Sequence, residues 1–197
     1  MEQPRQYIIQ LSGLPGSGKS TIAHRLARSI DGIVINHDLL KSFFLDTSAS
    51  TSTSTATSLD QAAKLAYTLD WILAEDLLKQ GRSVIIDSVC NYTTLIEKGV
   101  ELAEKFGCEY RFVECRVQDV EVLDRRLKGR VAMRSQRTGI DAPPVDAEGV
   151  GEGSVDHREV LRRKLENPVR PGSGAIVVDS SGSTEECVEE ILRRIVL

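Results

Sequence analysis

Residues 13–20, with the sequence GLPGSGKS, constrain the fold more than any other part of the chain. They match the pattern G-x-x-x-x-G-K-[ST] at every fixed position. An apolar run at 7–11 precedes this segment, and residues 21–30 carry apolar side chains at helical spacing. We therefore expect a buried strand, a tight glycine loop and a helix, which is the beginning of an α/β domain with parallel strands. The alternative is a glycine turn that only joins a strand to a helix.

A loop of this kind binds polyphosphate, because its backbone N–H groups turn inward and the helix N-terminus adds partial positive charge. We expect Lys19 to reach the β- and γ-phosphates of ATP and the Ser20 hydroxyl to bind Mg²⁺. The predicted cofactors are thus ATP and Mg²⁺. The predicted cofactor-binding residues are Gly13, Leu14, Pro15, Gly16, Ser17, Gly18, Lys19, Ser20 and Thr21.

The rest of the chain alternates apolar runs with helical patterns, without an internal repeat or a convincing domain boundary. We expect one α/β domain over residues 1–197. Near-continuous apolar strands are typical of a parallel sheet that is covered on both faces. We expect a long helix at 59–80 with a Ser58–Gln61 capping box and an apolar stripe formed by Leu65, Leu69, Ile72, Leu73, Leu77 and Leu78. Strands are expected at 7–12, 33–36, 83–87, 110–115 and 175–179, and further helices at 39–45, 91–106, 119–127, 155–165 and from 183 onward.

Two segments lack such patterns. Residues 47–58 contain ten Ser or Thr and two Ala, which cannot support a packed element, so we expect a mobile loop. A hydroxyl-lined substrate clamp or a phosphorylation site are the alternatives. A second segment, at about 126–153, begins with arginines and becomes rich in Gly, Pro and Asp, which favours a loop or lid.

Composition excludes several classes of protein. A net charge of −4 does not favour broad nucleic-acid binding, and no apolar run is long enough to span a membrane. The N-terminus lacks a signal-peptide pattern. The four cysteines show no C-x-x-C spacing, so we expect reduced thiols and an intracellular, cytoplasmic location; zinc ligands or a redox pair are the alternatives. Nothing in the sequence predicts an oligomeric state.

Acidic residues follow two of the expected strands. Asp87 ends the strand at 83–87, where it could hold Mg²⁺ through water or orient an acceptor; alternatively it only makes the strand end soluble. Asp38 follows the strand at 33–36 and could accept a proton from an acceptor hydroxyl, or cap the next helix. Lys41, one turn further on, could contact an anionic acceptor or be solvated.

A basic group follows at Arg125, Arg126, Lys128, Arg130, Arg134 and Arg137. Arg126 and Arg130 are four residues apart, so one helical face could present both to phosphates and stabilise a phosphoryl transition state. A solvated basic face and an RNA-contacting patch are the alternatives.

The chain resembles the P-loop kinases of the polynucleotide-kinase and zeta-toxin type, an AAA-type group of small kinases. The resemblance covers the glycine loop, residues 36–38 (Asn-His-Asp) and the strand at 84–87 with its continuation to Asn91. It implies that Asp38 is the general base, that Arg126 and Arg130 are lid arginines, and that 175–182 lies near adenine. It also implies a three-layer α/β/α fold with a five-stranded parallel sheet in the order 2-3-1-4-5. The chain departs from the family at Lys41, where polynucleotide kinases carry arginine, and in the Ser/Thr tract.

The predicted function is that of a kinase that transfers the γ-phosphoryl group of ATP to a hydroxyl of a small molecule or of a nucleic-acid 5′ end. Lys19, Asp38, Arg126 and Arg130 are its predicted catalytic residues, and Ser20 and Asp87 bind the metal. Asp38, Lys41, Asp87 and Asn91 are the predicted substrate residues. An ATPase or nucleotide-dependent switch is the alternative; a decayed binding module is disfavoured because Lys19, Ser20, Asp38 and Asp87 are all present.

Overall fold

The structure is a computed structural model that describes residues 5–50, 57–147 and 155–196, apart from the side chains of 48–50 and 196. One parallel sheet in the order β2-β3-β1-β4-β5 forms its centre. This result confirms the expected fold class and strand order. The strands are β1 (Tyr7–Ser12), β2 (Gly32–Asn36), β3 (Ser83–Asp87), β4 (Glu109–Arg116) and β5 (Ile176–Asp179).

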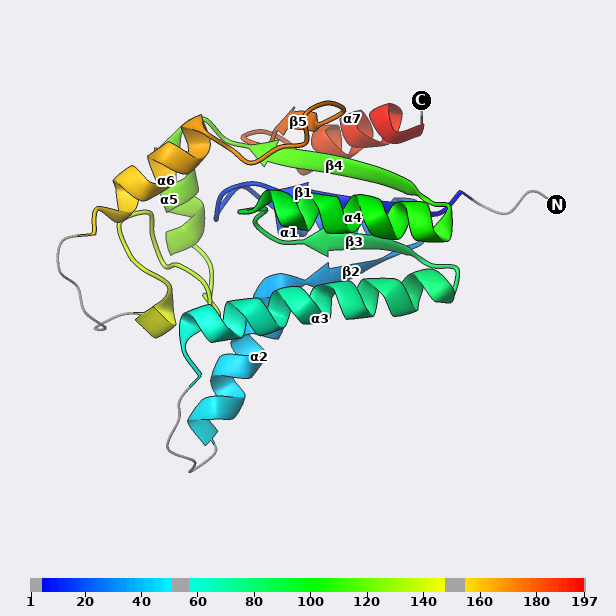
Figure 1. The fold of residues 1–197 in the computed structure, drawn as a ribbon. Coiled ribbons are helices and arrows are strands. Elements are labelled where there is room, and N and C mark those ends of the chain that lie inside the picture. Colours follow the sequence, from blue (N-terminus) through cyan, green and yellow to red (C-terminus); the bar gives the residue numbers. More distant parts are fainter. Residues whose placement is uncertain (1–4, 51–56, 148–154, 197) are drawn as a thin grey trace.

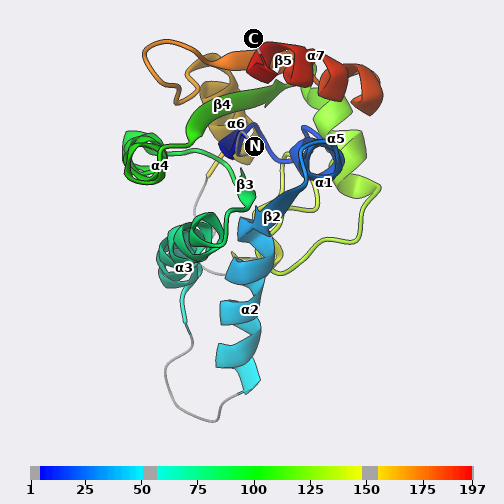
Figure 2. The same cartoon turned by 90° about the vertical axis from the view of Figure 1, so that its right-hand side faces the viewer.

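Helices cover both faces of the sheet (Figures 1 and 2). On one face, α1 (Lys19–Ser29) and α7 (Thr184–Val196) pack against β1, β4 and β5 through a core that includes Ile22, Leu26 and Ile191. On the other face, α3 (Leu59–Lys79) and α4 (Thr93–Phe106) pack through a second core. Every side chain of β1 and β3 is buried, which explains why their sequences are apolar without alternation.

The register of the strands creates a site at their carboxyl ends. Asp87 at the end of β3 is paired with Leu11 of β1 and with Asn36 of β2. The loop that follows β1 and the helix that follows β2 therefore begin beside the carboxylate of Asp87. In parallel α/β sheets this edge is where ligands bind.

The helix after β2 is longer than expected. α2 spans His37–Ser50, whereas the sequence predicts a helix at 39–45 and a loop from 47 onward. The loop prediction is wrong for residues 47–50, because α2, which crosses and packs against α3, continues through them, and adding a turn to an existing helix costs little. Within this turn the Thr47 hydroxyl donates to the Phe43 carbonyl (2.8 Å). Residues 51–56 of the tract lie outside the described residues.

α3 begins with the expected capping box, in which Ser58 and Gln61 exchange hydrogen bonds. The expected apolar stripe is correct only at its C-terminal end, where Leu78 is buried and Leu77 packs against the second core. Leu65 and Ile72 are instead 49% and 58% exposed. Small residues at four-residue spacing allow α3 to lie close to its neighbours, and this packing determines which face of the helix is buried. The buried face consists of Ala62, Ala66, Asp70, Ala74 and Leu78.

The segment after α5 (Val120–Lys128) is irregular, as expected, but it is packed against the domain. It contains a β-bridge between Arg137 and Pro144 and the single-turn helix η1 (Val145–Ala147). Ile140 is buried with Leu123 and Leu127, so the segment contributes to a core cluster, which its composition did not predict. Residues 148–153 of the expected lid lie outside the described residues, as does Ser154; Asp156 caps α6 (His157–Glu166).

Candidate active site

The glycine loop at 13–18 is shaped by backbone geometry that only glycine allows. Gly13 has a φ of +143°, and a Cβ atom there would lie 2.4 Å from the carbonyl oxygen of Cys115. Gly16 has a φ of +85°, and its Cβ would lie 2.9 Å from the carbonyl oxygen of Leu123. The loop thus lies directly against the end of β4 and against α5. The buried Leu14 side chain packs in the cluster that contains Leu123, so Leu14 can offer a ligand only its backbone.

A first cavity of about 450 Å³ is lined by Gly16–Gly18 of this loop and by the N-terminus of α1, whereas residues 13–15 do not line it. Lys19 is buried in its wall, and its ammonium has no hydrogen-bond or ion-pair partner among the described residues. The Ser17 hydroxyl in the same wall is buried and also lacks a partner. Unpaired polar groups of this kind at a helix N-terminus fit a polyphosphate ligand. We refer to this space as the nucleotide cavity. Ser20 and Thr21 also line it.

Arg126 connects two walls of the nucleotide cavity. Its Nη1 donates to the carbonyl of Ser180 (2.9 Å) and more weakly to that of Gly16 (3.4 Å), and its Nη2 donates to the carbonyl of Ser181 (2.9 Å). These bonds fasten α5 to the turn after β5, the segment that the family resemblance places near adenine. The sequence expected Arg126 and Arg130 to act together on the transferred group. The structure places only Arg130 in the walls of both cavities of the site.

Asp87 fits the predicted role at a metal. It is only 3% exposed, and one of its carboxylate oxygens, Oδ1, is buried without a hydrogen-bond partner. The described residues contain no group of three or more His, Cys, Asp or Glu side chains that could hold a metal ion by themselves. Mg²⁺ typically takes one or two protein oxygens, substrate phosphates and water. Ser20 and Asp87 are suitable for such a site.

A second cavity, of about 270 Å³, lies between α2, α3, α6 and the segment after α5, and we call it the acceptor cavity. Of the four predicted substrate residues, Asp38, Lys41 and Asn91 line it, and Asp87 does not. Asp38 Oδ2 accepts a hydrogen bond from Gln136 Nε2 (2.8 Å), which orients the carboxylate. Asn36, not Asp38, caps α2, because its Oδ1 accepts from the Leu39 N–H (3.1 Å). The carboxylate of Asp38 is therefore available for another role.

The two cavities meet. Lys19, Ser20, Arg130 and Gln136 line both of them. Burial lowers the pKa of Arg130, and the charge of Asp38 opposes that shift. An arginine at this junction can reach a group that passes between the cavities.

Sequence reasoning missed a buried His–Asp pair beside Asp38. His37 Nδ1 lies 2.7 Å from Asp70 Oδ2, and the imidazole stacks on Tyr67 with ring centroids 4.1 Å apart. Burial raises the pKa of Asp70, and the hydrogen bond and charge of His37 oppose that shift. His37 and Tyr67 line the acceptor cavity. The small-residue register of α3 around Asp70 was the signal that could have revealed this pair.

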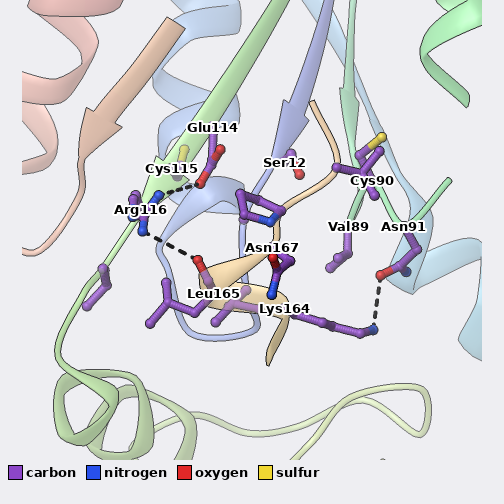
Figure 3. Close-up of a pocket in the computed structure, with 15 residues that line it drawn as sticks. Ser12, Val89, Cys90, Asn91, Glu114, Cys115, Arg116, Lys164, Leu165 and Asn167 are labelled. Atoms are coloured by element: carbon purple, nitrogen blue, oxygen red, sulfur yellow. Dashed lines mark hydrogen bonds and ion pairs between the residues drawn. The ribbon is translucent and has the colours of Figure 1, made fainter. Parts of the chain in front are cut away.

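A third cavity, of about 210 Å³, adjoins the acceptor cavity (Figure 3). The two share Val89, Asn91 and Lys164, and Lys164 Nζ donates to Asn91 Oδ1 (3.0 Å) between them. Its buried carboxylate, Glu114, is paired with Arg170 and Arg116. Its walls also contain Cys90 and Cys115, whose pKa values burial raises to about 11 and about 12.

All four cysteines are free and no disulfide links them, as the sequence predicted. High thiol pKa values, which burial produces, make such cysteines unreactive. The described part of the chain contains no helix that is both long enough and apolar enough to cross a membrane.

Comparison with known proteins agrees with this fold. The model of the AAA domain family matches residues 8–147. Among solved structures, a protein of Chloroflexus aurantiacus, provisionally assigned as a kinase, is similar with a TM-score of 0.68 and 19% identity, over 100% of this chain and 98% of that one. A sugar kinase of Janibacter sp. is similar with a TM-score of 0.62 and 17% identity, over 98% and 95%. The APS kinase CysC of Mycobacterium tuberculosis, solved with AMPPNP and APS, is similar with a TM-score of 0.61 and 16% identity. This likeness covers 98% of this chain and 99% of that one. No curated protein matches.

Proposed function

We propose that this chain, which belongs to the AAA domain family, is an ATP- and Mg²⁺-dependent kinase that phosphorylates a hydroxyl of a small molecule or of a nucleic-acid 5′ end. The observation that carries the proposal is the meeting of two cavities at Lys19, Ser20, Arg130 and Gln136. One cavity is built for polyphosphate, and the other presents an oriented carboxylate. A phosphoryl group that leaves the first cavity would enter the second. The likeness to small kinases supports the fold on which this arrangement rests.

The donor side of the reaction uses charge and backbone geometry. The loop N–H groups and Lys19 bind the phosphates, and Arg130 at the junction offsets the charge that spreads over the transferred group. Ser20 and Asp87 would hold Mg²⁺, which would supply positive charge against the charge that develops during transfer. Arg126 holds the wall of the nucleotide cavity in place through its three carbonyl partners.

The acceptor side uses Asp38 as the general base. Gln136 fixes the carboxylate of Asp38, so that its other oxygen can accept the proton of an acceptor hydroxyl. Lys41 and Asn91 line the same cavity and contact the acceptor. We assign the chain to the polynucleotide-kinase and zeta-toxin-like group on the sequence resemblance, and to a reducing intracellular compartment on its four free cysteines.

A screen of ATP consumption tests the proposal. The chain is incubated with Mg·ATP and a panel of hydroxyl-bearing metabolites and 5′-hydroxyl oligonucleotides, and phosphorylated product is detected by mass. Asp38→Asn should lower phosphoryl transfer by about 10²- to 10⁴-fold, the usual contribution of a general base, and leave ATP affinity within about twofold. Asp76→Asn, at an exposed position of α3, is the matched control. ATP turnover that no acceptor stimulates would instead favour an ATPase.

A further inference from the structure

The acceptor cavity contains more positive charge than its own carboxylates can balance. Lys41 comes from α2, Arg137 from the segment after α5, and Lys164 from α6, and all three line this cavity but not the nucleotide cavity. Two carboxylates also line it. Asp60 has an 85% exposed side chain that pairs with Lys64, and Asp38 is held by Gln136. We call Lys41, Arg137 and Lys164 the anion seat.

None of the three basic side chains forms an ion pair within the described parts of the chain. Lys164 donates to the amide oxygen of Asn91, Arg137 donates to the carbonyl of Ala142 (2.6 Å), and Lys41 has no hydrogen-bond partner there. Nearby arginines behave differently: Arg134 pairs with two carboxylates, as does Arg158. The lack of an ion-pair partner among the described residues thus distinguishes these three cations from Arg134 and Arg158.

The pKa values of all three cations are lowered, and repulsion between cations contributes for Lys41 and Lys164. Burial lowers the pKa of Lys41, and so does the charge of Arg137, although Asp38 and Asp60 oppose the shift. Lys164 is exposed as a whole residue, but partial desolvation lowers the pKa of its ammonium, and repulsion from Arg137 and Lys41 adds to this effect. Burial likewise lowers the pKa of Arg137. Unpaired charges in a cavity cost free energy, which a bound anion would recover.

ATP does not explain this excess of charge. Its phosphates are served by the loop, Lys19 and Arg130, which line the nucleotide cavity. We propose that the anion seat binds a phosphate group that the acceptor already carries, so that the substrate is a small phosphorylated alcohol. This inference rests on the proposed kinase function. A doubly charged phosphate matches three converging cations better than a carboxylate does. A cavity of about 270 Å³ suits a small metabolite, and a net charge of −4 disfavours a long polyanion.

Matched pairs of acceptors test the proposal: glycerol and glycerol 3-phosphate, ribose and ribose 5-phosphate, glucose and glucose 6-phosphate. We expect kcat/KM to be at least about tenfold higher for the phosphorylated member of the pair that reacts, the usual gain from charge-assisted hydrogen bonds. Lys41→Met and Lys164→Met should each raise the KM of that substrate by about ten- to a hundredfold and leave the KM of ATP within about twofold. Lys98→Met, on the surface of α4 where Lys98 pairs with Glu101, should change neither constant.

A binding measurement separates failure of this proposal from failure of the kinase function. Inorganic phosphate is titrated by calorimetry into the chain already saturated with Mg·AMPPNP, so that the loop is occupied. We expect binding that the double variant K41M/K164M abolishes. Two results would overturn the anion seat. One is a preference for neutral acceptors, for gluconate or for a 5′-hydroxyl oligonucleotide. The other is phosphate binding that the double variant retains. Phosphate binding at the seat without turnover of any acceptor would sustain the seat and overturn the kinase function instead.

Discussion

Replacement of Gly13 by alanine should destabilise the whole domain and not only the nucleotide cavity. The new Cβ atom would lie 2.4 Å from the carbonyl oxygen of Cys115, which belongs to β4, an interior strand of the sheet. β4 is paired with both β1 and β5 and cannot move away cheaply. The left-handed φ of +143° adds a cost of about 1–2 kcal/mol, and overpacking adds about 1–3 kcal/mol. We therefore expect the free energy of unfolding to fall by about 2–5 kcal/mol.

Gly81→Ala is the matched control, because Gly81 also has a positive φ, of +77°, but nothing lies within 4 Å of the position of its Cβ. The free energy of unfolding of this variant should fall only by the backbone contribution of about 1–2 kcal/mol. Urea unfolding is followed by the fluorescence of Trp71, the single tryptophan, which packs against the core, and by far-ultraviolet circular dichroism. If Gly13→Ala lost no more stability than Gly81→Ala, the close contact with β4 would not exist as described.

Two further substitutions address the donor side of the proposed reaction. Asp87→Asn should raise the Mg²⁺ concentration for half-maximal activity by about ten- to a hundredfold, since the buried Oδ1 loses its charge. The measurement is a Mg²⁺ titration of activity at saturating ATP. If the variant and the unchanged chain gave the same titration curve, Asp87 would not belong to the metal site. Arg126→Met should raise the KM of ATP by about tenfold, because the bonds to Gly16, Ser180 and Ser181 are lost. A fall in kcat at constant KM would show instead that Arg126 acts on the transferred group.

The errors of the sequence analysis share a cause. The stripe of α3 was assigned to leucines because they are large and apolar, but the helix buries Ala62, Ala66 and Asp70, whose small size permits close packing. The Ser/Thr tract has low helix propensity, yet its first four residues continue α2, a helix that packs against α3. In both places a packed helix outweighed a local preference worth only tenths of a kcal/mol per residue.

The sequence predicted the donor half of the site more completely than the acceptor half, for a similar reason. The donor half is contiguous in the chain, so its glycines, Lys19 and Ser20 could be recognised as one motif. The acceptor half is assembled from α2, α3, α6 and the segment after α5. Asp38, Lys41 and Asn91 were chosen from their places after strands, and they do line one cavity. Gln136, Asp70 and Lys164 belong to no local pattern and were not found.

The sequence by itself determined the strand, glycine loop and helix at 7–29 and the parallel α/β class, because these depend on local backbone geometry and on apolar periodicity. The strand order came from a resemblance and was confirmed by the register of the sheet. Only the tertiary structure decided that Arg126 holds the turn after β5 while Arg130 stands between two cavities. Only the tertiary structure shows that Lys41, Arg137 and Lys164 line one cavity and that none of them is paired with a carboxylate of the described residues. Charge balance within a cavity depends on which distant segments meet there, and no local pattern in the chain encodes that meeting.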